Sequence, residues 1–125
     1  MTASRLLALT LILPMGLAFA MSRTQLEELR DALATDNPEA LKALAVDLVS
    51  HNEQDPVALD LIADRVAADQ GTQDAALADS LAWLCRVFAN VRASRYKQFL
   101  DKVSDNAGSM RLRTYAAVVS VGLPG

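Results

Sequence analysis

Apolar residues recur at helical spacing along most of the chain, and prolines mark where two of the helices begin. Asn37 and Asp55 each place a capping side chain directly before a proline that can occupy the first position of a helix. Apolar positions follow at i, i+3, i+4 and i+7 in both segments: Leu41, Leu44, Ala45, Leu48 and Val49 in the first, and Leu59, Ile62, Ala63 and Val66 in the second. The pattern predicts one helix from Pro38 and another from Pro56, the second ended by Gly71.

The same spacing predicts four further helices. Ser22 caps a helix over residues 24–34, and later helices span about residues 74–91, 94–104 and 109–121. Their predicted inward residues are Leu26, Leu29 and Leu33, then Leu77, Leu81, Leu84, Cys85 and Phe88, then Tyr96, Phe99, Leu100 and Val103, and last Leu112, Tyr115, Ala116 and Val119. No segment alternates between apolar and polar residues as a half-buried strand would.

The spacing of the six helices indicates how they are arranged. The first, third and fifth helices begin near residues 22, 56 and 94, and steps of this length are typical of helix-pair repeats. Abundant alanine and leucine, with few aromatic residues, also favour helix over sheet. The predicted fold is therefore all-α, with about six helices as three stacked helical hairpins.

The first twenty residues have the three parts of a secretory signal peptide. One arginine precedes an apolar run, and Ala18 and Ala20 form a small-x-small cleavage pattern. The apolar run is about 15 residues long, shorter than the roughly 20 that span a bilayer as a helix. We therefore expect residues 1–20 to be removed, leaving residues 21–125 as one domain in the periplasm or outside the cell, with no transmembrane span. The alternative is that Met21 is the true start of the protein.

The segment Leu81 to Tyr96 contains the only tryptophan and the only cysteine of the chain. A helical wheel places Cys85 on the apolar face, where we expect it to behave as a small core hydrophobe. Trp83 falls on the opposite stripe with Asp79 and Arg86. Two interpretations of Trp83 stay open at this point, namely packing against a neighbouring helix and a partly exposed anchor at an interface.

Residues 78–116 resemble a HEAT-like helical repeat found in bacterial exported proteins of poorly defined function. The resemblance is carried by the run Ala82, Trp83, Leu84, Cys85 and Arg86, by Arg95 and Tyr96, and by Leu112, Arg113, Tyr115 and Ala116. The chain departs from that pattern at residues 90–94, where a glycine-containing turn is usual. The resemblance implies an α-solenoid fragment that contacts other macromolecules, and it implies no catalytic residues.

Charge is distributed unevenly along residues 21–125. Residues 21–81 hold thirteen acidic and four basic residues, a balance of −9, whereas residues 82–125 hold seven basic and two acidic residues, a balance of +5. Oppositely charged ends favour head-to-tail self-association or docking to an acidic envelope protein or an anionic membrane surface. A bland alternative is that the charges only keep the fold soluble. Nucleic acid is a poor partner for a domain whose net charge is negative.

Signatures of catalysis are scarce. The only histidine, His51, lies in the segment HNEQDP, which we interpret as a solvated turn between helices, and the chain has no phosphate loop and no nucleophile or metalloprotease motif. We therefore predict a non-catalytic interaction or scaffold module of the bacterial cell envelope, without cofactor or metal. The rival is a small enzyme or ligand-binding protein with a site between helix pairs. The predicted contact residues are Trp83, Arg86, Arg95, Arg111 and Arg113.

Overall fold

Side-chain caps fix where the first four helices of the structure begin. The computed structural model describes residues 20–91 and 93–123, so the predicted signal peptide lies outside them except for Ala20. The helices are α2 (Arg23–Leu33), α3 (Pro38–Ser50), α4 (Pro56–Asp69), α5 (Ala75–Arg86), α6 (Ser94–Asn106) and α7 (Met110–Val121). The side chains of Asn37 and Asp55 accept hydrogen bonds from the first turns of α3 and α4, which confirms both predicted starts.

The fourth predicted helix is shorter than its apolar pattern indicates. It was predicted to continue to Val91, but α5 ends at Arg86 and residues 87–90 form a 3₁₀ helix, η1 (Val87–Asn90). The tighter 3₁₀ turn directs two consecutive side chains, those of Val87 and Phe88, into the core. No glycine or proline marks this change in the sequence, so the helix pattern alone does not reveal it.

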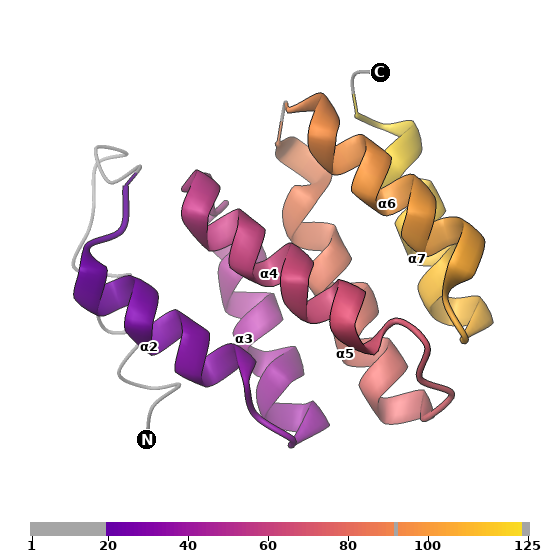
Figure 1. The fold of residues 1–125 in the computed structure, drawn as a ribbon, viewed down its shortest axis with the longest axis horizontal. Coiled ribbons are helices and arrows are strands. Elements are labelled where there is room, and N and C mark those ends of the chain that lie inside the picture. Colours follow the sequence, from indigo (N-terminus) through magenta and orange to yellow (C-terminus); the bar gives the residue numbers. More distant parts are fainter. Residues whose placement is uncertain (1–19, 92, 124–125) are drawn as a thin grey trace.

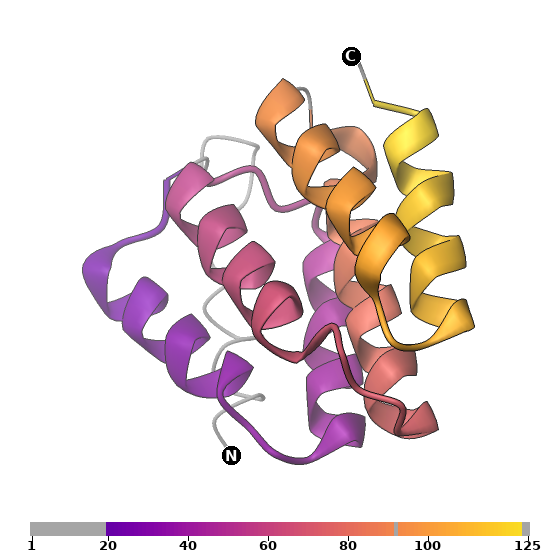
Figure 2. The same ribbon diagram turned by 45° about the vertical axis from the view of Figure 1, so that its right-hand side comes forward.

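The described residues form six helices. These helices lie in two layers, as Figures 1 and 2 show. In one layer α3 packs on α5 and α5 on α7, and in the other α2 packs on α4 and α4 on α6. Each helix of the second layer joins the next helix along the chain, which gives the hairpins α2–α3, α4–α5 and α6–α7. The structure therefore confirms an all-α fold of three stacked helical hairpins. No helix within the described residues is long and apolar enough to cross a membrane.

The core lies between the two layers and includes predicted inward leucines of every hairpin, although Leu26 and Leu77 are only partly buried. Phe88 is its largest fully buried side chain, and its ring centroid lies 5.0 Å from that of Tyr96 and 5.5 Å from that of Phe99. Cys85 is buried beside Phe88 as a free thiol, as predicted. Burial raises the pKa of the Cys85 thiol to about 12, so the reactive thiolate is scarce in the folded protein.

Two loops from neighbouring hairpins meet at Gly108. The Gly108 N–H donates to the carbonyl of Gln70 at 2.8 Å, which joins the α6–α7 turn to the end of α4. A Cβ atom added to Gly108 would overlap the carbonyl group of Gly71, whereas a Cβ on Gly71 itself would meet nothing within 4 Å. Only one of these two glycines is therefore required by close backbone packing.

We expect Gly108→Ala to destabilise the protein by about 1–3 kcal/mol, because the added methyl group forces two backbone segments apart. Gly71→Ala is the matched control and should change the free energy of unfolding by less than about 0.5 kcal/mol. Urea denaturation of both variants measures the difference, and equal stabilities would contradict the close approach of the two loops.

Candidate interaction surface

Trp83 lies in the last turn of α5, with one cation close to its ring and another further away. Its side chain is half-buried and packs against the hydrophobic core. The guanidinium carbon of Arg86 lies 4.1 Å from the ring centroid, and the ammonium nitrogen of Lys42, on α3, lies 5.9 Å from it. Each such contact contributes about 0.5–1 kcal/mol at an exposed site. Trp83 therefore packs inward and is also partly exposed beside these two cations.

Asp79 of α5 forms ion pairs with both other helices of this layer. Its carboxylate lies 3.0 Å from the Lys42 ammonium of α3 and accepts a hydrogen bond of 2.6 Å from Nε of Arg111 on α7. Burial acts to raise the pKa of Asp79, but the hydrogen bonds from Lys42 and Arg111 outweigh it and hold the pKa below its usual value. Arg111 in turn lies over the ring of Tyr115, 5.4 Å from its centroid.

The structure brings together three of the five predicted contact residues. Trp83, Arg86 and Arg111 lie along one face of the α3–α5–α7 layer, which we call the basic–aromatic surface; its further members are Lys42, Asp79 and Tyr115. Lys42 and Asp79 were not among the predicted contact residues. Their contact joins residues 37 positions apart, so helix periodicity places each on a face without showing that the faces meet.

Arg95 lies elsewhere, in the other layer of helices. It begins α6, where its guanidinium lies 3.1 Å from the Asp60 carboxylate of α4 and donates to the hydroxyl of Tyr96 at 2.6 Å. Burial, together with the hydrogen bond to Asp60, raises the pKa of Tyr96 to about 12. Arg95 therefore connects α4 to α6 and is not a neighbour of Trp83.

Arg113 also lies apart from the basic–aromatic surface. It follows Arg111 by two residues, which turns it about 200° around the helix. It is half-buried on the side of α7 that carries Ser120, and Ser120 is hydrogen-bonded to Lys97 and Asp101 of α6. The two arginines are close in sequence but face different neighbours.

The side of α7 that faces away from α5 carries two exposed apolar side chains. Met110 is 67% exposed and Val121 is 81% exposed, and together with Thr114 and Ala117 they recur at i, i+4, i+7 and i+11. We call these four residues the open-end stripe, because α7 is the last helix of its layer within the described residues. Leu112, Ala116 and Val119 are buried on the inward side, so α7 is apolar on two opposite sides. That double pattern is the signal in the sequence that could have revealed the stripe.

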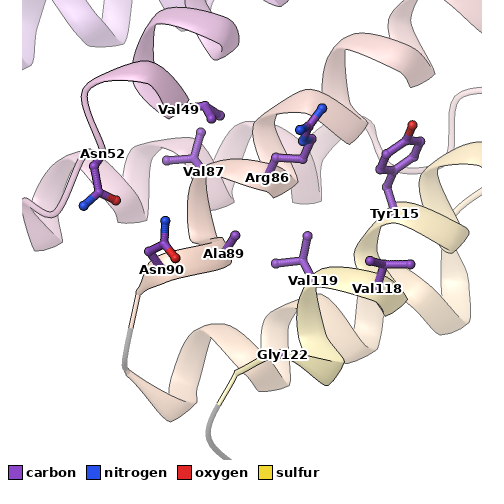
Figure 3. A pocket seen from close by; sticks show the side chains of 10 residues that line it. All are labelled: Val49, Asn52, Arg86, Val87, Ala89, Asn90, Tyr115, Val118, Val119 and Gly122. Carbon is purple, nitrogen blue, oxygen red and sulfur yellow. The ribbon is translucent and has the colours of Figure 1, made fainter.

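A groove of about 470 Å³ adjoins the basic–aromatic surface. It lies where α3, α5 and α7 end, and Figure 3 shows side chains from all three helices and from η1 around it. Val49, Val87 and Val118 supply apolar walls, whereas Asn52 and Asn90 bring amide groups to the edge. Arg86 also lines the groove, so the groove and the basic–aromatic surface share this residue.

The HNEQDP turn is more buried than the sequence indicates. Asn52 has a positive φ of 58°, which makes the tight turn, but Glu53 and Asp55 are only 6% and 4% exposed. Our interpretation of a solvated turn is therefore wrong for these two carboxylates. The reason is a chain of hydrogen bonds, in which Glu53 accepts from the Asp55 N–H at 2.9 Å and lies 2.8 Å from Nε2 of His51. No three His, Cys, Asp or Glu side chains in the described part of the chain converge as metal ligands.

Comparison with protein-family models, curated proteins and solved structures finds no match to this chain.

The pKa of His51 gives the turn a testable pH dependence. Burial acts to lower this pKa, but the hydrogen bond that the ring donates to Glu53 and the negative charges of Glu53 and Asp47 outweigh it, so the pKa is raised. The stabilisation from protonated His51 is complete below about pH 6.5, the ordinary value, and is lost as pH rises through the higher pKa of the folded state.

We expect the single histidine ring signal to titrate above pH 6.5 in a nuclear magnetic resonance experiment. Glu53→Gln should lower that midpoint, because it removes the partner charge. His51→Gln should remove the stability loss that the unmodified protein shows as the pH rises above about 6.5. A midpoint at or below the ordinary value would contradict the pairing.

Proposed function

We propose that this protein is a non-catalytic protein-interaction module of the bacterial cell envelope, and that the open-end stripe of α7 is its main contact surface. The observation that carries the proposal is the two-sided apolar character of α7, since no helix within the described residues covers Met110 and Val121. End repeats of helical stacks need a polar outer face to stay soluble, unless another surface covers them. The signal-peptide pattern supports an envelope location, and the resemblance to HEAT-like repeats supports a role in contact.

The described residues favour a second copy of this chain as the partner that covers the open-end stripe. Residues 23–50, the first hairpin, hold six acidic and three basic residues, whereas residues 94–121, the last hairpin, hold five basic and two acidic residues. The side of α3 that faces away from α5 carries Ala40, Ala43 and Asp47, small and acidic residues at i, i+3 and i+7. Asp47 is half-buried and lies 3.8 Å from His51, so this side of α3 is nearly flat and can cover the apolar stripe of α7.

Stacking α7 of one copy on α3 of the next would continue the order in which α3, α5 and α7 already pack. The contact would be heterologous, because two different patches of the same chain meet. It would therefore extend into a row of copies. The basic–aromatic surface would run along one face of that row, with Trp83 and Arg86 of each copy available to a further envelope protein.

Two substitutions test this contact from both ends. Val121→Asp puts a charge in the apolar stripe, and Ala43→Arg puts a long charged side chain on the flat side of α3, so each change prevents the two surfaces from closing on one another. We expect either change to raise the apparent dissociation constant of self-association at least about tenfold in sedimentation experiments at low salt. Val57→Asp, at an exposed valine of α4, is the control and should have no effect.

Mixing the two variants gives the sharpest outcome. Each variant keeps one intact end, so an equimolar mixture should form dimers that cannot grow further. A protein that is monomeric at all concentrations would overturn self-association, and capture of an envelope protein that Val121→Asp abolishes would then assign the stripe to a different partner. Binding to anionic vesicles, with no protein partner, would overturn the proposed function.

The groove between the ends of α3, α5 and α7 supports a second candidate function, the binding of a small ligand. Its volume of about 470 Å³ lies in the range of small-molecule sites, and apolar walls with a few polar groups are typical of them. Arg86 at its edge favours a ligand that is apolar with an anionic group.

Anilinonaphthalene sulfonate, an apolar anion, is a suitable probe of this groove. If the groove binds ligands, the probe should bind saturably at one site per chain, and Ala89→Phe should weaken it about tenfold or more by filling the space. Self-association should be unchanged, because Ala89 is not part of the open-end stripe. Probe binding that is absent, or that Ala89→Phe leaves unchanged, would exclude this second candidate.

A further inference from the structure

The buried carboxylate of Asp55 accepts hydrogen bonds from two separate segments of the chain. Its Oδ1 caps α4 by accepting hydrogen bonds from the N–H groups of Val57 at 2.8 Å and Ala58 at 3.0 Å. Its Oδ2 accepts a hydrogen bond of 2.7 Å from the backbone nitrogen of Met21, which lies 34 residues earlier in the chain. The second bond is as short as those that charged nitrogen donors make to carboxylates.

Met21 is held in this place by more than one contact. Its side chain packs against the hydrophobic core, and the next residue, Ser22, opens α2 through the capping box with Gln25. Ala20, in contrast, is exposed. The backbone nitrogen of residue 21 is therefore fixed against a buried carboxylate at the position where the sequence predicts that a signal peptidase cuts the chain.

We propose that Asp55 is the binding site for the α-ammonium group of Met21, which is released by cleavage after Ala20. Water supplies the hydroxyl group that completes the carboxyl group of Ala20, and the nitrogen of Met21 takes up protons to become an ammonium group. Cleavage thus converts an amide hydrogen bond into an ion pair at the same two atoms. The first residue of the processed chain is tied to the start of α4.

The charges around Asp55 agree with this assignment. Glu53 is paired with His51, but no ion pair among the described side chains includes Asp55. A buried carboxylate is costly without a counter-charge, and removing one partner of a buried pair leaves that cost in place. The helix terminus at α4 supplies part of the compensation, and the Met21 ammonium supplies a full positive charge.

The test compares chains that differ only at the nitrogen of Met21. One chain begins with a free Met21, released from an amino-terminal fusion, one has the same nitrogen acetylated, and one retains Ala20. All three keep an N–H group that can donate to Asp55, but only the first has the charge. Asp55→Asn is made in each, because asparagine caps helices about as well as aspartate.

We expect the chain with free Met21 to have an unfolding equilibrium constant about tenfold lower than the other two at neutral pH, measured by urea denaturation. With Asp55→Asn the three chains should differ by no more than about twofold, because the counter-charge is gone. Equal stabilities of the free and acetylated chains would overturn the proposal, as would an unchanged difference with Asp55→Asn. Mass spectrometry of the exported protein should find Met21 as its first residue, and a different first residue would also overturn it.

Discussion

The rest of this fold depends on the packing of α5, the middle helix of its layer. A middle helix must pack against a neighbour on each flank and also against the opposite layer. Small residues on α5, Ala78, Ser80 and Ala82, are buried and let its neighbours approach closely. The Ser80 hydroxyl donates to the carbonyl of Pro38, at the start of α3, with a distance of 2.6 Å. On its other flank, Asp79 holds Arg111 of α7. The position of α5 therefore sets the positions of both outer helices of its layer.

Within the part of the chain that the structure describes, the outer helices of each layer have a neighbour on one flank only, and this asymmetry is the physical basis of the proposed contact. A hydrophobic side chain on the uncovered flank adds nothing to the stability of the folded chain and leaves its apolar surface in contact with water. Its burial by another surface is therefore favourable. The opposite net charges of the first and last hairpins add long-range attraction between copies, and they oppose stacking of two like ends.

Local chemistry made much of this fold predictable. Asn37 and Asp55 mark helix starts because capping is a contact between near neighbours in sequence, and Cys85 is placed in the core by simple periodicity. The end of α5 at Arg86 was not predictable, since it depends on the packing of Phe88 against α6.

The contact surface was less predictable than the helices. Helix periodicity shows which residues share a face but not which faces meet, so Arg95 was grouped with Trp83 although it lies in the other layer. The burial of Glu53 and Asp55 depends on hydrogen bonds within the turn and on a segment 34 residues away, and neither has a signature in the local pattern.

Cys85, the lone cysteine of this domain, is fully buried at the centre of the fold. In any oxidising compartment an accessible unpaired thiol forms mixed disulfides with other chains. Because Cys85 reaches solvent only when the layers separate, the folded protein is protected from this cross-linking and the unfolded chain is not. Close packing around α5 therefore also prevents oxidation of Cys85. A substitution that destabilises any of the three hairpins would increase the fraction of chains in which this thiol is exposed and reactive.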